Sequence, residues 1–460
     1  MTMSSEQQQA RLQELRLALV LPQYQMVLAE RHGEARRLPR IAIRRQERTA
    51  AQVSSALQVK WGVQSILIDL LPGSCRLPSC AVIEVLNLHS EFPSDELVPV
   101  SIDGLEGQDF TYSEGHTIRS IMAGETQNRG PFSRVGWIKE AQAWIRDSVV
   151  DRPIEFNGRV QQLSASGSFA LLRFEMIEGP DYWLKAPNAR NTHELETTQT
   201  ISRLFPQCVP PFIGARPEWN AWITEDCGRP LQNENGSAAF VAAIHCIAEL
   251  QMASVAHIEV LLACGCFDQR MPSLRKQVPD LIQYLEGAMA RQTSTRVAPL
   301  NAKRLRELGR CIEAATVAME ALGIPDTLIH NDVNTGNILF DGRRAVFTDW
   351  AEACVGCPFL TFRHLQVQAL EADETCLWAN QLREIYRNCW GAHLSDAQIE
   401  KAFVLSPPLA IASYLCGRDP SFASAHRALD SVQSYARSLA RHLDRFAQAP
   451  EFLEGICSRV

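Results

Sequence analysis

The chain has 460 residues, of which 46% are hydrophobic and 21% are charged, and its formal net charge is −7. This composition is typical of an ordinary globular protein of two or three domains. The absence of a dense run of Lys and Arg argues against a nucleic-acid-binding surface. No stretch of about 18 apolar residues predicts a membrane span, and the polar N-terminus lacks the apolar segment of a secretory signal. We therefore expect a cytoplasmic protein.

The 14 cysteines are expected to be reduced thiols, many of them buried. The close pairs are Cys264 with Cys266 and Cys354 with Cys357. A zinc site needs four ligands at paired spacing, and no second convincing pair complements Cys354 and Cys357. We predict neither a zinc site nor a redox-active pair.

The first 134 residues predict a domain of their own. Apolar runs at 17–22, 64–72 and 81–86 indicate strands, and charged or Gly/Pro-rich turns separate them. Residues 135–154 predict a connecting helix, which carries Trp137 and Trp144, followed by a linker. We expect a small α/β or β-rich domain with a regulatory, substrate-shaping or dimerising role. The strands resemble a Nudix-like sandwich, but the glutamate-rich Nudix motif is missing and we expect no hydrolase activity.

The middle of the chain alternates strand and helix patterns. Residues 156–186 read as strand, small-residue turn, strand, turn, strand, with SASGS at 164–168 as the first turn. An amphipathic helix is predicted over 191–205, and residues 221–231 read as a further strand with a connecting segment after it. The rest predicts helices, which lie at 237–262, 301–322, 362–390, 396–416 and 422–447.

The candidate catalytic and metal-binding residues lie in the segment 328–350, LIHNDVNTGNILFDGRRAVFTDW. It has the layout of a kinase catalytic loop, H-x-D-x-x-x-x-N, then a short hairpin and a second Asp at a strand end. Asp332 can orient an attacking hydroxyl and accept its proton. Asn337 and Asp349 supply the oxygen ligands that Mg²⁺ prefers. His330 is expected to support the loop by hydrogen bonding.

These residues resemble the aminoglycoside phosphotransferase superfamily, which also includes choline, homoserine and methylthioribose kinases. Its members usually show H-G-D-x-x-x-x-N followed by D-W or D-x-E. Here Asn331 stands where Gly is usual, and Asp349 is followed by Trp350. The resemblance implies an α+β, two-lobe protein-kinase-like fold, with a β-rich small lobe at 155–228. The helical large lobe, with the catalytic loop and the acceptor site, would span 229–460.

The resemblance also implies an ATP site in the small lobe. Lys185 would hold the phosphates, oriented by Glu194, with Glu196 as the fallback partner. Ser166 and Gly167 could place backbone N–H groups on phosphate oxygens, although G-x-G-x-x-G is absent and an ordinary polar turn fits them equally well. At the hinge, Glu225 and Asp226 would lie beside the adenine and offer backbone donors and acceptors.

We therefore predict an ATP- and Mg²⁺-dependent phosphotransferase that acts on a hydroxyl of a small molecule, an aminoglycoside or another cationic acceptor. Candidate residues for binding a cation are Asp268, Glu371, Asp373 and Glu374, although 371–374 also fits a solvated helix face. One alternative is a metabolite kinase of the choline or homoserine kinase type. The other is a pseudokinase-like nucleotide-binding or regulatory interaction protein.

Overall fold

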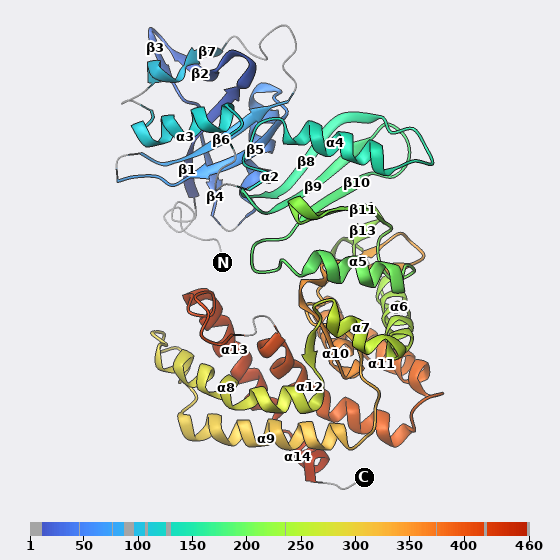
Figure 1. The fold of residues 1–460 in the computed structure, drawn as a ribbon. Helices are drawn as coiled ribbons and strands as arrows, with labels where there is room; N and C mark the ends of the chain where they lie inside the picture. The colour runs from blue at the N-terminus through green and yellow to red at the C-terminus, as the bar shows by residue number, and fades with distance from the viewer. Residues whose placement is uncertain are drawn as a thin grey trace. The chain divides into compact units, whose positions relative to one another are not determined.

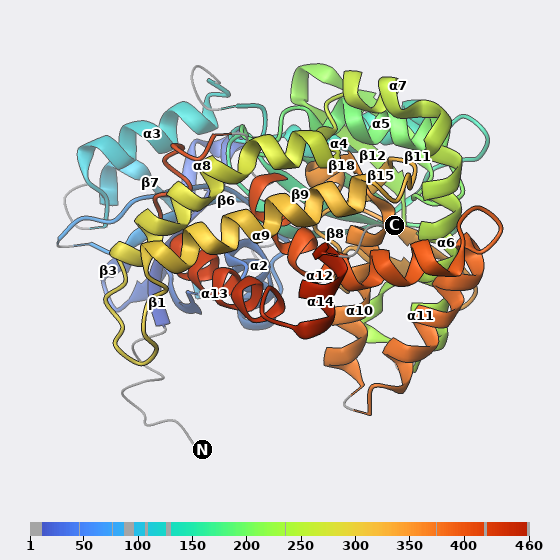
Figure 2. The same ribbon diagram turned by 90° about the horizontal axis from the view of Figure 1, so that it is seen from below.

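The computed structural model describes residues 12–45, 47–75, 77–86, 96–105, 109–125, 130–234, 236–373, 375–417 and 421–457. The chain forms two compact units (Figures 1 and 2). Unit one contains residues up to Leu195 together with Phe212–Asp226. Unit two contains Glu196–Pro211 and Cys227–Val460. Residues 155–195 and 212–226 of the predicted small lobe fall in unit one with the N-terminal region, and residues 196–211 fall in unit two.

Unit one begins with a seven-stranded mixed sheet, which we call the N-terminal sheet. Its strands are β1 (Leu12–Leu21), β2 (Met26–His32), β3 (Ala35–Arg37), β4 (Arg40–Arg44), β5 (Ser65–Leu71), β6 (Ser79–Val85) and β7 (Leu97–Ser101). The order is β3-β2-β1-β6-β5, with β4 also paired to β1 and β7 to β2. Strands β1 and β6 run parallel and the other pairs antiparallel.

Helices α2 (Thr49–Trp61) and α3 (Tyr112–Met122) contribute to separate hydrophobic clusters with this sheet. Successive residues of a strand point to opposite faces. In β1, Leu17 and Leu19 accordingly pack in the cluster of α2, while Ala18 and Val20 pack in that of α3. This double burial explains why β1 reads as a continuous apolar run. Neither helix was predicted.

The second sheet of unit one is antiparallel and five-stranded. It contains β8 (Phe156–Ala165), β9 (Ala170–Met176), β10 (Tyr182–Ala186), β11 (Phe212–Arg216) and β12 (Ala221–Glu225), in the order β11-β12-β10-β9-β8. Alternate residues of β10, Tyr182, Leu184 and Ala186, are buried in one cluster with helix α4 (Trp137–Ser148). Because of this alternation, Lys185 lies on the opposite face of the sheet. Helix α5 (Glu194–Leu204) follows β10.

Unit two is mainly helical. Its helices are α6 (Ala238–Ser254), α7 (Ile258–Ala263), α8 (Met271–Ala290), α9 (Ala302–Glu320), α10 (Pro358–Ala372), α11 (Leu377–Trp390), α12 (Asp396–Gly417), α13 (Asp430–Phe446) and α14 (Pro450–Cys457). Two three-stranded sheets carry the connecting loops. One contains β14 (Phe267–Gln269), β18 (Ala353–Gly356) and β15 (Thr327–His330), and the other β13 (Arg229–Pro230), β16 (Ile338–Phe340) and β17 (Ala345–Phe347).

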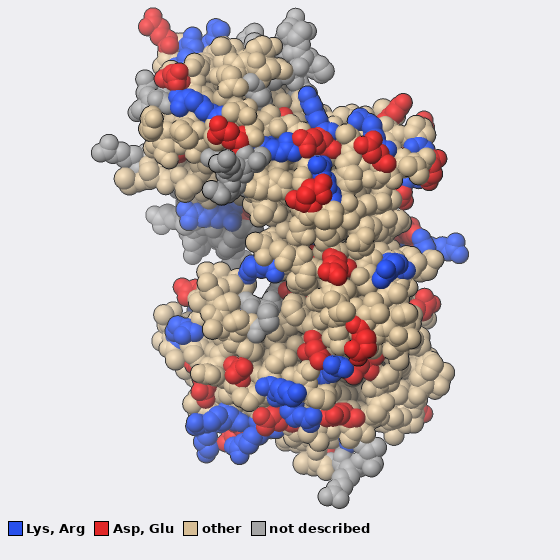
Figure 3. All heavy atoms as spheres, in the orientation of Figure 1, with Lys and Arg blue, Asp and Glu red and all other residues tan. Residues whose placement is uncertain are grey.

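The predicted α+β class is confirmed: a region rich in β-sheet precedes a mainly helical C-terminal region. The helix predicted over 362–390 is in fact two helices, because Cys376 takes a left-handed conformation, with φ of 61°, between α10 and α11. The helix predicted over 422–447 begins later, at Asp430. Acidic and basic side chains lie interspersed on the face of each unit seen in Figure 3.

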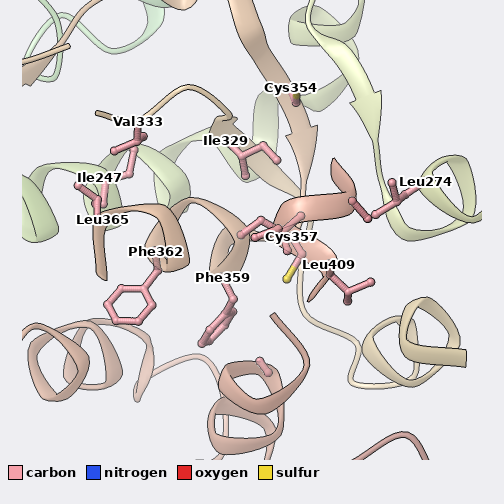
Figure 4. Packing of buried hydrophobic residues seen from close by; sticks show 14 of the residues in the cluster. Ile247, Leu274, Ile329, Val333, Cys354, Cys357, Phe359, Phe362, Leu365 and Leu409 are labelled. Carbon is pink, nitrogen blue, oxygen red and sulfur yellow. The ribbon is translucent and has the colours of Figure 1, made fainter. Parts of the chain in front are cut away.

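Two helical stretches are long and apolar enough to span a membrane by length and composition, Ala238–Ala263 and Asp396–Gly417. Of the 18 most apolar consecutive residues in each stretch, 56% and 67% are buried within the protein. Both contribute to the large hydrophobic core of unit two, and core helices commonly have this composition. Figure 4 shows part of that core, including Ile247 from the first stretch and Leu409 from the second.

Candidate active site

The catalytic loop follows strand β15, whose last residue is His330. Strand β15 is fully buried and pairs with β18, with His330 opposite Ala353. Ile329 before the loop and Val333 within it are both core residues, and Figure 4 shows Val333 beside Ile247 and Leu365. The chain is thereby held by packed side chains both before and directly after Asp332.

Hydrogen bonds within the loop close it around Asp332. Asn337 donates its Nδ2 to the main-chain carbonyl of Asp332 over 2.9 Å. Asn334 accepts from the N–H of Gly336 over 2.9 Å, and its carbonyl accepts from the N–H of Asn337 over 3.0 Å. A carbonyl can only accept, so the amide of Asn337 must present its nitrogen to Asp332. The Oδ1 atom of Asn337 remains an acceptor for another partner.

Thr348 connects the catalytic loop to the second carboxylate. Its carbonyl lies 2.9 Å from Nε2 of His330, and its N–H donates to the carbonyl of Asn337 over 2.9 Å. His330 is fully buried, with its ring centroid 4.6 Å from that of Trp350. The main chain directly before Asp349 is therefore bound to the residue at each end of the His330–Asn337 loop.

Asp349 itself has an uncommon backbone conformation, with φ and ψ both 65°. Among the described residues only Gln25, Asn220 and Cys376 share a positive φ without being glycine. A non-glycine residue in the left-handed region carries a conformational cost, and such residues concentrate at functional sites. Asp349 lies between strand β17 and the short 3-10 helix Trp350–Glu352.

Asn331, the departure from the usual glycine, is buried against helix α12. Its Nδ2 donates to the carbonyl of Ser413 over 3.1 Å, and its N–H donates to the carbonyl of Glu352. The side chain lies over Gly417, where a Cβ atom would come within 2.6 Å of Nδ2. The larger residue is therefore accommodated by a glycine on the helix that faces it.

In unit one, Lys185 and Glu194 form an ion pair. Nζ of Lys185 lies 2.5 Å from Oε1 of Glu194, which is 1% exposed, and 5.6 Å from the ring centroid of Trp222. Glu196, the fallback partner, is exposed. The structure thus brings together Lys185 and the first of the two glutamates considered.

The other residues predicted for nucleotide binding have local partners. Ser166 and Gly167 lie in the β8–β9 turn, where Ser166 exchanges hydrogen bonds with the backbone of Phe169. The carboxylate of Glu225 pairs with Arg152, and that of Asp226 with Arg173 over 2.8 Å. The N–H of Asp226 donates to the carbonyl of Asp181. The predicted roles of all four residues stay predictions.

Residues 211–393 match the sequence pattern of the phosphotransferase enzyme family (APH). This segment belongs to that family. It contains the whole catalytic loop and Asp349, and the match confirms the predicted superfamily and the class of small-molecule phosphotransferase. Lys185 and Glu194 lie upstream of the matched residues.

Three solved structures illustrate the similarity. A choline/ethanolamine kinase family protein from Mesorhizobium loti is 16% identical, with 69% of this chain and 97% of that chain covered and a TM-score of 0.46. An aminoglycoside phosphotransferase from Alicyclobacillus acidocaldarius is 18% identical, with 64% and 91% covered and a TM-score of 0.41. The macrolide 2'-phosphotransferase MphH from Brachybacterium faecium is 15% identical, with 65% and 97% covered and a TM-score of 0.42. The search of curated proteins gave no match.

The acidic residues considered for acceptor binding in this phosphotransferase lie in different settings. Asp268 pairs with Arg270 over 2.8 Å and accepts from Ser273. Burial alone would raise the pKa of Asp268, but the hydrogen bonds from Arg270 and Ser273 outweigh it and lower the pKa. Glu371 is exposed, Asp373 accepts hydrogen bonds from Thr375, and Glu374 lies outside the described residues.

The cysteines of the phosphotransferase are free thiols. Cys354 and Cys357 are buried, and burial raises the pKa of Cys357 to about 12. Within the described ranges, no group of three or more His, Cys, Asp or Glu side chains has the geometry to hold a metal ion. A Mg²⁺ site of the kinase type needs only one or two protein carboxylates, with waters and phosphates completing it.

Thr348 and Asn334 are the residues of the phosphotransferase loop that the sequence did not single out. Thr is common at strand ends, and Asn is common in turns, so neither residue type stands out in a single sequence. Their hydrogen bonds are local, and the position of Thr348 immediately before Asp349 was the available signal.

Proposed function

We propose that the protein transfers the γ-phosphoryl group of ATP, with Mg²⁺, to a hydroxyl group of a small molecule in the cytoplasm. The observation that carries this proposal is the hydrogen-bonded unit of His330, Asp332, Asn337 and Thr348, which ends at Asp349 within the family-matched segment. Phosphoryl transfer depends on positioning and on charge stabilisation, and these hydrogen bonds hold the loop side chains in place next to strands β15, β16 and β17.

The donor set around the loop suits Mg²⁺. Asn337 offers its amide oxygen because its nitrogen is bound to Asp332, and Asp349 offers a carboxylate. Both are hard oxygen ligands of the type that Mg²⁺ prefers. Bound Mg²⁺ neutralises charge on the phosphate oxygens. The carboxylate of Asp349 would bind the ion, and the hydrogen bonds of Thr348 fix the main chain next to Asp349.

Asp332 is assigned the role of orienting the acceptor hydroxyl and taking its proton. Its backbone carbonyl is held by Asn337, so the side chain projects from a fixed point of the loop. In unit one, Lys185 is assigned to the nucleotide phosphates. Its pairing with Glu194 restricts the rotamers of a flexible side chain, which lowers the entropy cost of placing the ammonium group.

An acceptor screen with ATP as donor tests this function. Aminoglycosides, choline, ethanolamine and homoserine are offered to the full chain, and phosphorylated product is measured by mass spectrometry. We expect product with one acceptor class from the wild type and none from Asp332→Asn, with nucleotide binding nearly intact in the variant. Equal product formation by wild type and Asp332→Asn would contradict the proposal.

A further inference from the structure

The turn at residues 130–133, just before helix α4, lies directly against the β8–β9 hairpin. Gly130 has φ of +79°, and a Cβ atom there would lie 2.2 Å from the carbonyl oxygen of Gly167. Two residues later, the N–H of Phe132 donates to the same carbonyl over 3.3 Å. Residue 130 therefore has to be glycine for two reasons, its left-handed backbone and its contact with the hairpin.

The 130–133 turn is anchored by the side chain of Phe132. This ring is 1% exposed, and its centroid lies 5.0 Å from that of Trp137 and 5.6 Å from that of Trp219, both in edge-to-face arrangements. Buried aromatic pairs of this kind hold a definite geometry. The contact with Gly167 is thus made by a rigid segment.

A second connection joins the hairpin to the N-terminal sheet. Gln162 of β8 is 1% exposed, accepts from the N–H of Leu67 over 2.8 Å and donates to its carbonyl over 2.9 Å. Leu67 pairs with Ile83 of β6, and β5 is an edge strand of the N-terminal sheet. An edge strand leaves backbone N–H and C=O groups without ladder partners on its outer side. The amide of Gln162 satisfies both groups of Leu67.

A third connection fixes the beginning of α4. Both carboxylate oxygens of Glu84 in β6 lie within 3.1 Å of the N–H of Gly136, the N-cap residue of the helix. An anion at a helix N-terminus is stabilised by the helix dipole. Glu84 therefore ties the N-terminal sheet to the helix that covers one face of the β8–β12 sheet.

We propose that the N-terminal sheet and the 130–133 turn form a positioning element for the β8–β9 hairpin and thereby set the affinity of the enzyme for its nucleotide. This inference rests on the proposed function and on the prediction that the hairpin residues Ser166 and Gly167 lie at the nucleotide phosphates. A hairpin that is already held in place loses less conformational entropy when it closes on a ligand. The N-terminal region thus acts on binding without contacting the ligand.

The test compares Gly130→Ala with Gly124→Ala in the full chain. Both glycines have positive φ, so both substitutions carry backbone strain, but a Cβ at Gly124 meets nothing within 4 Å. A second pair uses Gln162→Leu, which loses the bonds to Leu67, and Gln161→Leu, the same change at an exposed neighbour. The readouts are hydrogen exchange of the amides at 164–170 and the Kd for Mg·ATP from calorimetry.

We expect Gly130→Ala and Gln162→Leu to accelerate exchange in the hairpin and to weaken Mg·ATP binding by roughly fivefold or more, because the hairpin is no longer preorganised. Gly124→Ala and Gln161→Leu should leave both quantities as in the wild type. Identical hairpin exchange in Gly130→Ala and Gly124→Ala would overturn the positioning role. Faster exchange with unchanged affinity would overturn its link to the nucleotide. Failure of the proposed function is distinct, because the wild type itself would then not bind Mg·ATP.

Discussion

Asn331 and Gly417 occupy complementary space: the side chain of Asn331 lies where a Cβ atom on Gly417 would come within 2.6 Å of its Nδ2. Asn331 belongs to the catalytic loop and Gly417 is the last residue of α12, so the pair fixes the distance between the loop and this helix. The same Nδ2 atom donates to the carbonyl of Ser413 in α12. Asn331, which stands where the family usually has glycine, is therefore accommodated by a glycine on α12.

The first prediction uses this pair in a double-mutant cycle. Gly417→Ala should lower the free energy of unfolding by about 1–3 kcal/mol, because the added methyl group overpacks a buried contact. The double variant Asn331→Gly/Gly417→Ala should recover part of that loss, since the opposing side chain is gone. Gly287→Ala, inside α8, serves as the control because its Cβ would meet only the flexible end of Arg291. Urea denaturation measures the wild type, both single variants Gly417→Ala and Asn331→Gly, the double variant and the control, and strict additivity would argue against the contact.

The second prediction concerns the partner of Lys185. Glu194→Gln should weaken ATP binding because Lys185 loses the charged group that orients it, at a cost of about 1.5–3 kcal/mol, or roughly 10- to 150-fold in affinity. Glu196→Gln is the matched control, since Glu196 is exposed two residues further along the chain. Calorimetric titration with ATP compares the two variants. Equal affinities would show that Glu194 does not orient Lys185.

The third prediction concerns His330. His330→Ala should destabilise the fold by about 2–4 kcal/mol, since it leaves a cavity beside Trp350 and removes the partner of the Thr348 carbonyl. It should also lower kcat, and the change in kcat should be larger than the change in the KM for ATP. The reason is that Asp332 and Asp349 lose their mutual alignment. His442→Ala on the exposed side of α13 should change stability by less than about 0.5 kcal/mol. Thermal unfolding and steady-state kinetics provide both readouts.

The fourth prediction is a pH dependence in the N-terminal sheet. Burial alone would raise the pKa of Glu114, but hydrogen bonds from Arg16 and Thr111 outweigh it and lower the pKa. A carboxyl group with a lowered folded-state pKa stabilises the protein above its unfolded pKa of about 4.3, and this stabilisation is lost as pH falls through the folded value. Acid unfolding of unit one should therefore begin as the pH falls below the unfolded-state pKa of about 4.3 towards the lower pKa of the folded state.

The same buried pair predicts the effect of substitution. Nη2 of Arg16 lies 2.5 Å from Oε1 of Glu114, and the Arg16 side chain is 0% exposed. Glu114→Gln should cost about 3–5 kcal/mol at pH 7, because it leaves a buried charge without its partner. Glu14→Gln, which affects an exposed pair with Arg40, should cost at most about 1 kcal/mol. A smaller loss for Glu114→Gln than for Glu14→Gln would contradict this account.

The site was more predictable from sequence than the N-terminal region. The contacts that build the loop, from His330 to Thr348 and from Asp332 to Asn337, are short in sequence, so the spacing of residue types carries the information. Helix α8 was missed because Pro279 lies inside it, where proline usually ends or kinks a helix. The bond between Gln162 and Leu67 joins residues 95 positions apart, and a single sequence contains no local signal for such a pairing.

The most direct test of phosphoryl transfer at this site is calorimetric titration of wild type and Asp349→Asn with ATP, with and without Mg²⁺. Asp280→Asn, an exposed residue of α8, is the control. We predict Mg²⁺-dependent binding by the wild type and by Asp280→Asn, and a loss of the Mg²⁺ dependence in Asp349→Asn. Binding by the folded Asp349→Asn variant with unchanged Mg²⁺ dependence, or no binding by the folded wild type, would contradict the account.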